Sequence, residues 1–216
     1  MRVACVGYRD WALQIYDNLA ATCECNFLII RSLAQYNKEL IRDFKPDLVL
    51  FYGWSWKIEK EIINDYICLM LHPSELPKYR GGSPIQNQII DGITVTKASI
   101  FKMVDEIDAG DIVAQSDLSL DGYVDEILDR LTKIGIEETR ILLKHGITTK
   151  PQKHEFATYR TRLTPKESEI TVDELINEKG EYLYNKIRML TGPYPRAYFK
   201  TRDGKKILFD KVRLID

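Results

Sequence analysis

Residues 71 to 92 read LHPSELPKYRGGSPIQNQIIDG, and this stretch decides the fold because it interrupts a regular alternation of strands and helices. It begins with His72, at the point where an apolar segment ends. Prolines fix the path of the loop that follows, and glycines let a backbone approach a ligand closely. Sites in open parallel sheets form at the carboxyl ends of strands. The stretch therefore predicts a functional loop around His72, with a histidine that merely ends a strand as the alternative.

The segments before this loop alternate between short apolar runs and amphipathic runs. Strands are expected at 1–7, 26–30, 46–52 and 66–71, and helices at 10–21, 33–44 and 58–64. Near-continuous apolar strands separated by helices are typical of a mostly parallel sheet with helices on both faces. The pattern predicts an α/β, Rossmann-like fold.

The segments after the loop extend this unit and then add a smaller one. Helices are expected at 84–91, 124–145 and 171–190, and strands at 94–103 and 112–118, with a hairpin formed by 198–200 and 207–215. Thr171 and Glu174 form a capping-box pattern. The polar, turn-rich segment 150–166 is interpreted as a linker. The predicted division is a catalytic domain at 1–158 and a C-terminal extension, a helix plus a hairpin, at 159–216.

Composition narrows the class of protein. The chain has 31 basic and 32 acidic side chains, and this balance disfavours a protein built to grip a phosphate backbone. Cys5 and Cys68 lie in apolar runs and are expected to be buried thiols, whereas Cys23 and Cys25 lack a second pair of metal ligands. No apolar stretch approaches the roughly 18 residues of a membrane span. We expect a cytoplasmic protein without a bound metal.

Asp108 lies in an acidic loop, 104–111, that allows three interpretations. Composition alone favours a solvated acidic turn. A carboxylate metal site is disfavoured because no histidine lies nearby and the spacing of the acids matches no calcium loop. The third interpretation pairs Asp108 with His72, since a carboxylate orients an imidazole and favours its charged form. Such a pair can manage protons while an amine attacks a carbonyl carbon.

Two stretches of this sequence resemble the signatures of the formyltransferases that use 10-formyltetrahydrofolate. One is residues 71–92, and the other is MVDEIDAGDIVAQ at 103–115. The anchors of the two signatures, His72 and Asp108, have the separation that this family shows. RTRLTPKESEI (160–170) and YNKIRMLTGPYPRAYF (184–199) resemble the tail shared by tRNA and sugar members. The resemblance implies a Rossmann-like formyltransferase fold and a transferase that takes its formyl group from 10-formyltetrahydrofolate.

The resemblance also implies roles for individual residues. His72 and Asp108 match the catalytic histidine and aspartate of the family. Met70 stands where the family has an asparagine whose amide donates to the formyl oxygen, and a methionine cannot replace that donor. The imidazolium of His72 can act alone, an amide of Gln86 or Asn87 can substitute, or the protein is weakly active or inactive.

Binding residues are implied in the same way. The folate donor is expected to contact residues after the third strand and in the acidic loop, namely Phe51, Trp54, Ser55, Trp56, Val104, Asp105 and Ile107. The acceptor is expected to contact the loop after His72, namely Pro73, Ser74, Lys78, Arg80, Gly81, Gly82 and Ser83. The tryptophans could instead pack an adjoining helix. Lys78 and Arg80 could instead be solvated surface charges.

The acceptor is predicted by elimination within the family. Too few residues follow the linker for a five-stranded tRNA-binding barrel, and the net charge of −1 also disfavours nucleic acid. We therefore expect a small-molecule amine, a nucleotide-linked amino sugar, with a homodimer through the tail hairpin as a further possibility. The alternatives are formylation of methionyl-tRNA, hydrolysis of formyl-folate, and binding of folate or nucleotide sugar without turnover.

Overall fold

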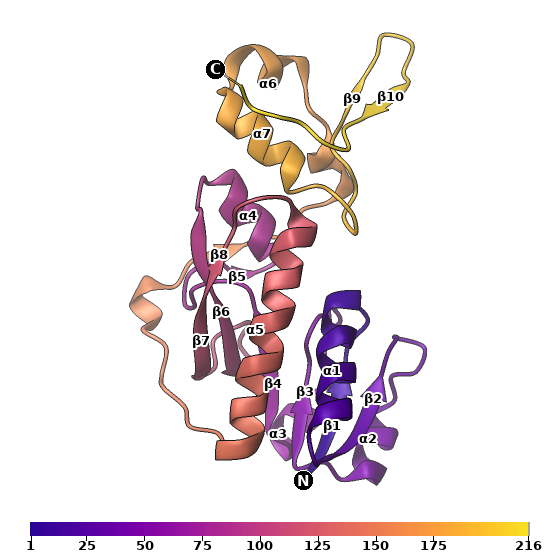
Figure 1. Cartoon of the computed structure of the whole chain (residues 1–216), viewed down its shortest axis with the longest axis vertical. Helices are drawn as coiled ribbons and strands as arrows, with labels where there is room; N and C mark the ends of the chain where they lie inside the picture. The colour runs from indigo at the N-terminus through magenta and orange to yellow at the C-terminus, as the bar shows by residue number, and fades with distance from the viewer. Residues whose placement is uncertain (216) are drawn as a thin grey trace.

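A computed structural model describes residues 1–215 and places a six-stranded sheet of order β2-β1-β3-β4-β6-β7 at the centre of the molecule (Figure 1). The four parallel strands are β1 (Arg2–Val6), β2 (Asn26–Ile30), β3 (Leu48–Leu50) and β4 (Cys68–His72). The strands β6 (Val95–Lys102) and β7 (Ile112–Ser119) continue the sheet in antiparallel pairing. The predicted mostly parallel sheet is confirmed.

Helices cover both faces of the sheet and create two apolar cores. The helices α1 (Asp10–Thr22) and α5 (Val124–His145) lie on one face, and α2 (Lys38–Phe44) and α3 (Lys60–Asp65) contribute to the core on the other. Alternation along β1 divides its side chains between them. Val3 and Cys5 pack in the first core and Ala4 and Val6 in the second, each with no exposed surface. The strand is therefore apolar at consecutive positions.

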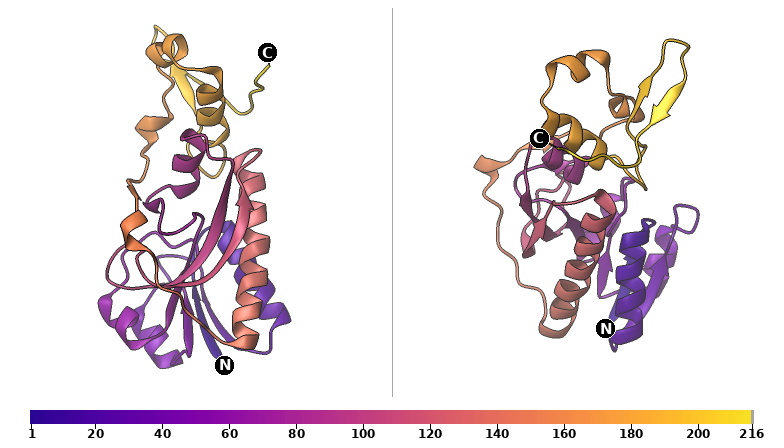
Figure 2. Two further views of the ribbon diagram at one scale, coloured as in Figure 1. Left: turned by 90° about the vertical axis from the view of Figure 1, so that its left-hand side faces the viewer. Right: turned by 45° about the horizontal axis from the view of Figure 1, so that its top comes forward.

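The C-terminal extension lies beyond the end of the sheet opposite the N-terminus (Figures 1 and 2). Its elements are α6 (Val172–Asn177), α7 (Gly180–Arg188), β9 (Tyr198–Lys200) and β10 (Lys206–Leu208). Helix α7 packs against α4 (Pro84–Ile90), the helix that follows the His72 loop. Buried Arg188 anchors α7 because its Nη1 donates to the carbonyl oxygens of Leu120 and Gly122, at 2.6 and 2.7 Å.

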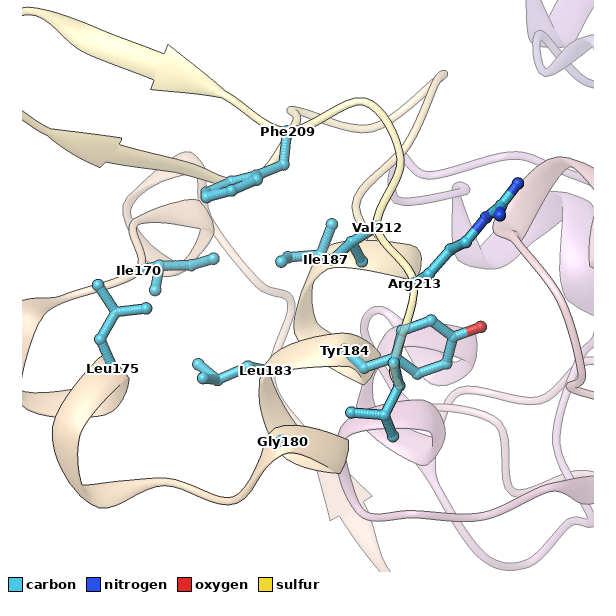
Figure 3. Close-up of a pocket in the computed structure, with 10 residues that line it drawn as sticks. Ile170, Leu175, Gly180, Leu183, Tyr184, Ile187, Phe209, Val212 and Arg213 are labelled. Carbon is cyan, nitrogen blue, oxygen red and sulfur yellow. The ribbon is translucent and has the colours of Figure 1, made fainter. Parts of the chain in front are cut away.

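The expected single helix at 171–190 is wrong, because the chain becomes extended at Glu178 and Lys179 and forms two helices. The break has a packing reason. In one straight helix Leu175 and Leu183 would stand about 12 Å apart along the axis. Here both line one cavity of about 240 Å³ between α6, α7 and the tail (Figure 3). The capping box of Thr171 and Glu174 is present as predicted.

Three other sequence-based boundaries also need correction. The helix expected at 33–44 begins only at Lys38, where Asn37 caps it by accepting from the Glu39 N–H. The second strand of the tail hairpin is limited to Lys206–Leu208. The segment 150–166 contains the short helical turns η1 (His154–Phe156) and η2 (Pro165–Ser168) and the strand β8 (Tyr159–Arg160), so it is not a bare linker.

The four thiols are free, and two of them are deeply buried. Burial raises the pKa of Cys68 to about 12 and raises that of Cys5 well above its ordinary value. The expectation of buried thiols at these two positions is confirmed. Over residues 1–215, no helix has the length and apolar character needed to cross a bilayer.

Candidate active site

His72 ends β4 and is held in place from two sides. Alternation along β4 puts Met70 and His72 on the same face of the sheet, away from Leu69 and Leu71. Only 5% of His72 is exposed. Its Nε2 lies 2.9 Å from the carbonyl oxygen of Tyr79, and its Nδ1 lies 3.6 Å from Oδ2 of Asp108. The structure thus brings together the imidazole and the carboxylate that are far apart in sequence.

Asp108 is oriented by the loop that follows His72. Its Oδ2 accepts a hydrogen bond of 2.7 Å from the backbone N–H of Gly81, and its backbone adopts a left-handed φ of 51°. The side chain is 10% exposed, which excludes the solvated acidic turn as a description of Asp108. The Nε2 of His72 is within hydrogen-bonding distance of its carbonyl partner, whereas the 3.6 Å between Nδ1 and Asp108 Oδ2 is a close contact longer than a hydrogen bond.

Arg80 belongs to a buried network and is not a surface charge. It is 1% exposed, and its Nε and Nη2 donate to Oε1 of Gln152 at 3.2 and 2.7 Å. Its Nη1 donates to the Tyr159 hydroxyl at 2.7 Å and lies 3.4 Å from Oε1 of Glu106. These partners engage the guanidinium within the protein, which corrects the alternative that Arg80 is solvated.

Gln152 connects this network to the Asp108 loop and was missed by the sequence analysis. Its Nε2 donates to the carbonyl oxygens of Asp108 and Gly110, at 2.9 and 2.6 Å. The amide is therefore fully used, with Arg80 on its oxygen and two backbone carbonyls on its nitrogen. The glutamine lies in a polar segment without periodicity, and nothing in that pattern distinguishes it from a solvated residue.

Gly81 and Gly82, in the loop after His72, pack closely against the backbone of residues 160–162. The strand β5 (Arg80–Gly81) pairs in parallel with β8. A Cβ on Gly81 would lie 2.4 Å from the carbonyl oxygen of Arg160, and a Cβ on Gly82 would lie 2.4 Å from the Arg162 backbone. Residues 160–162 therefore occupy the space that side chains would fill at these two glycines, and the expectation that the glycines contact a ligand stays a prediction.

The remaining loop residues shape the backbone or reach solvent. Ser74 is fully buried and its hydroxyl donates to the Lys78 carbonyl at 2.7 Å, and the Pro73 carbonyl accepts from Gln88 at 2.8 Å. Lys78 is exposed and pairs with Glu75 at 3.2 Å. The Ser83 hydroxyl accepts from the Leu163 N–H at 3.1 Å.

The two candidate amides on α4 differ in what they already bind. Asn87 donates from Nδ2 to the carbonyl oxygens of Gly82 and Thr161, at 2.9 and 3.3 Å. Gln86 is 2% exposed, and its Nε2 has no hydrogen-bond partner among residues 1–215. A buried donor without a partner is costly, so this amide calls for a water, an ion or a ligand as its acceptor. Of the two, Gln86 has a free donor to offer.

An aromatic cluster lies beside Met70 in the second core. Trp54 packs at ring-centroid distances of 4.8 Å from Trp56 and 5.1 Å from Tyr36, and Tyr8 lies 4.5 Å from Trp56. Trp54 is 7% exposed and its Nε1 has no acceptor within the described chain. Met70 is partly buried against this cluster and offers no donor.

The other expected donor-binding residues differ in how deeply they are buried. Phe51 is fully buried, and the Ser55 hydroxyl accepts from the Tyr8 hydroxyl at 2.9 Å. In the Asp108 loop, Val104 and Ile107 are 42% and 64% exposed. Asp105 is half exposed and pairs with Lys60 at 2.5 Å. The exposed aliphatic side chains of this loop are available to a ligand, whereas Phe51 could contribute only its backbone.

A histidine and an aspartate paired at the carboxyl edge of an α/β sheet can manage the protons of an acyl-group transfer. A model of the family described as Formyl transferase matches residues 24–144. Methionyl-tRNA formyltransferase of Sulfurihydrogenibium sp. (strain YO3AOP1) is 34% identical over 184 residues, which cover 81% of this chain and 57% of that protein. The chain belongs to the formyl transferase family, and it spans little more than half the length of this curated relative.

Solved structures give the same result for the fold. A chain described as methionyl-tRNA formyltransferase from Clostridium thermocellum superposes with a TM-score of 0.85 at 33% identity, covering 97% of both chains. A 4-N formyltransferase from Francisella tularensis superposes with a TM-score of 0.78 at 18% identity, covering 99% of this chain and 98% of that one. The predicted formyltransferase fold is thereby confirmed.

Proposed function

We propose that this protein transfers the formyl group of 10-formyltetrahydrofolate to the amine of a small molecule, a nucleotide-linked amino sugar. The observation that carries the proposal is the 3.6 Å contact between His72 Nδ1 and Asp108 Oδ2, in a chain of the formyl transferase family. Both side chains are largely buried at the end of β4, where an open sheet binds its ligands.

The aromatic cluster fits a flat, nitrogen-rich ring. Trp56 presents a face that is 41% exposed, and the buried Nε1 of Trp54 lacks an acceptor that a pterin ring could supply. We assign the donor to this cluster and to the adjoining loop with Val104, Asp105 and Ile107. The donor, when bound, supplies an activated formyl carbon. Protons must be transferred by side chains of the protein.

The reaction joins the acceptor nitrogen to the formyl carbon and breaks the bond from that carbon to the folate nitrogen. The amine must lose one proton, and the departing folate nitrogen must gain one. His72 and Asp108, whose Nδ1 and Oδ2 face each other, can take this proton from the amine, hold it transiently and deliver it to the departing folate nitrogen. The Gly81 N–H and the Gln152 amide hold Asp108 in the required orientation.

The formyl oxygen gains negative charge as the bond forms, and this charge needs a hydrogen-bond donor. Met70 cannot supply one, and the Nδ2 of Asn87 already serves two carbonyl oxygens. We propose that Gln86 Nε2 substitutes for the missing asparagine. A single such donor contributes about 10²–10³ in rate.

The charge balance supports a small acceptor. With 31 basic and 32 acidic side chains, the chain lacks the positive excess expected of a protein that neutralises many phosphates. Methionyl-tRNA is the second candidate acceptor, because the relatives that are 33–34% identical carry that name.

The decisive experiment supplies 10-formyltetrahydrofolate with a panel of amino-sugar nucleotides and, separately, methionyl-tRNA, and reads products by mass spectrometry. A gain of one formyl group on an amino-sugar nucleotide is expected. Formylated methionyl-tRNA alone would establish the second candidate. Formate release without any amine would reveal a hydrolase, and tight folate binding without a product would mark a binding protein.

A further inference from the structure

The guanidinium of Arg9 has no acidic partner among residues 1–215. Arg9 lies in the turn between β1 and α1, and among residues 1–215 its side chain makes no ion pair or hydrogen bond. Its Cζ lies 4.8 Å from the ring centre of Tyr8 and 5.6 Å from that of Tyr194. The second tyrosine comes from the C-terminal extension, so Arg9 joins the two parts of the chain.

The surroundings of Arg9 fix its position without using its hydrogen-bond donors. A Cβ on Gly53 would lie 3.0 Å from the Arg9 Cβ and 3.2 Å from its Cγ, so the arginine stem crosses the turn after β3 in close contact. Aromatic rings contact a guanidinium through its faces and leave its in-plane N–H groups available. Such a group is suited to binding a phosphate or a carboxylate through two parallel hydrogen bonds.

Two further polar groups lack partners where the extension meets the catalytic part. Thr191 lies three residues before Tyr194, and its buried Oγ1 has no hydrogen-bond partner among residues 1–215. Gln86 lies on α4, the helix that packs against α7, and its buried Nε2 is equally without a partner. Unpartnered buried polar atoms are rare in folded proteins, and each calls for a partner such as a water, an ion or a ligand.

The two cations expected to bind an acceptor phosphate are already engaged. Arg80 is enclosed by Gln152, Tyr159 and Glu106, and Lys78 pairs with Glu75 on the surface. Arg9 stands at the carboxyl end of β1, on the same edge of the sheet as His72 at the end of β4. Unlike Arg80 and Lys78, Arg9 therefore has its hydrogen-bond donors available to a charged ligand.

We propose that Arg9, whose guanidinium contacts the rings of Tyr8 and Tyr194, is an oxyanion-binding subsite for one of the two substrates of the proposed transfer reaction. The inference rests on that proposed function for the identity of the ligands. The oxyanion is either a phosphate of the acceptor or a carboxylate of the folate glutamate. Both groups accept two hydrogen bonds from one guanidinium, and the test distinguishes them.

The test is calorimetric binding to the purified full chain, with Arg9→Ala and Arg9→Lys as variants. The probes are thymidine diphosphate, 5-formyltetrahydrofolate and 5-formyltetrahydropteroate, which lacks the glutamate. Loss of a charge-assisted pair weakens binding about 10- to 100-fold.

A loss of affinity confined to thymidine diphosphate assigns the acceptor phosphate. A loss for the folate but not for the pteroate assigns the glutamate. Arg9→Lys should recover only part of the affinity, because an ammonium cannot bind through two parallel bonds.

Arg42→Ala is the matched control, since Arg42 pairs with Glu39 on the surface of α2 and its removal changes net charge equally. Tyr194→Phe should preserve the affinity, and Tyr194→Ala should reduce it. Equal affinity of Arg9→Ala and the wild type for all three probes would overturn the subsite, as would a wild type that binds none of them at millimolar concentration. Arg9-dependent binding without formyl transfer would instead reject the proposed function and keep the subsite.

Discussion

Two donors of Arg80 share one acceptor atom of Gln152, because Nε and Nη2 of the arginine both donate to Oε1 of the glutamine, at 3.2 and 2.7 Å. The other end of the glutamine donates to the carbonyl oxygens of Asp108 and Gly110. Asp108 has a left-handed backbone, which is unfavourable for a residue other than glycine. The pair of Arg80 and Gln152 therefore supports the conformation that presents the Asp108 carboxylate to His72.

Replacing Gln152 with alanine should lower kcat about 10- to 100-fold and change KM for the donor little, because the loop relaxes while the donor contacts remain. Stability should fall by about 1–3 kcal/mol as the buried partners lose their hydrogen bonds. Arg130→Ala is the control, because Arg130 also donates to two carbonyl oxygens, those of Ser119 and Asp121, away from the Asp108 loop. An equal drop in kcat for both variants would show that lost stability alone explains the effect.

His72→Ala and Asp108→Asn should each lower kcat by about 10²–10⁴, since each removes one member of the proton-transfer pair. His145→Ala is the control, because that histidine is exposed at the end of α5. Circular dichroism and melting curves establish that the variants fold. Full transfer rates in a folded His72→Ala protein would reject the assigned role.

Gln86→Leu should separate activity from stability. It removes a buried amide nitrogen without a partner, so stability should stay constant or rise, while kcat falls about 10²–10³ if that amide meets the formyl oxygen. Asn87→Leu removes two hydrogen bonds from the next position and should destabilise the fold.

Met70→Asn tests the same donor from the other side. It should raise the rate little in the wild type, where Gln86 serves, but restore much of the rate lost in Gln86→Leu. A large increase from Met70→Asn alone would indicate that the wild type lacks a donor at this point.

Gly82→Ala should destabilise the protein by about 1–3 kcal/mol, the range for overpacking, and reduce activity, because its Cβ would lie 2.4 Å from the Arg162 backbone. Gly146→Ala meets no atom within 4 Å and has only its positive φ of 87° as a source of strain, so about 1 kcal/mol is expected. Denaturant unfolding measures both. Similar losses for the two variants would contradict the assigned close approach.

Acid should weaken the C-terminal extension through Glu174. Burial acts to raise the pKa of this carboxyl, but hydrogen bonds from Lys186 and the Thr171 backbone outweigh it, and the pKa lies below the ordinary 4.5. A lowered folded-state pKa gives stability that is present above pH 4.5 and is lost as pH falls through the folded value. Melting curves from pH 7 to 3 should fall less steeply below pH 4.5 for Glu174→Gln than for the wild type. Glu178→Gln, an exposed neighbour, should keep the wild-type slope.

Apolar patterning predicted the sheet and most of the helices because each core face imposes its own periodicity. It failed at 171–190, because two short amphipathic helices in succession have the same apolar spacing as one long helix. Only the packing of the tail against both helices distinguishes the two cases. It also failed at 150–166, because a short strand such as Tyr159–Arg160, exposed on both sides, carries no alternation.

The site was predictable only in part. His72 and Asp108 lie in recognisable stretches of sequence. Arg9, Gln152 and Tyr194 act through contacts with residues far away in the chain, and no local pattern carries that information. The loop glycines were expected to let the backbone approach a ligand, but the neighbour that the structure shows, residues 160–162, comes from a segment interpreted as a linker.

The pairing of β5 with β8 has a consequence for how this architecture can diversify. The predicted division between residues 158 and 159 falls inside the segment that braces the catalytic loop. Any exchange of the extension for a different acceptor-selecting module would have to join after Leu163, since an earlier junction would remove Tyr159 and Arg160 from beside Arg80 and Gly81. The segment that leads to the extension thus also supports the loop beside His72. A recombination event that cuts this segment would disturb the proposed active site as well as exchange the extension.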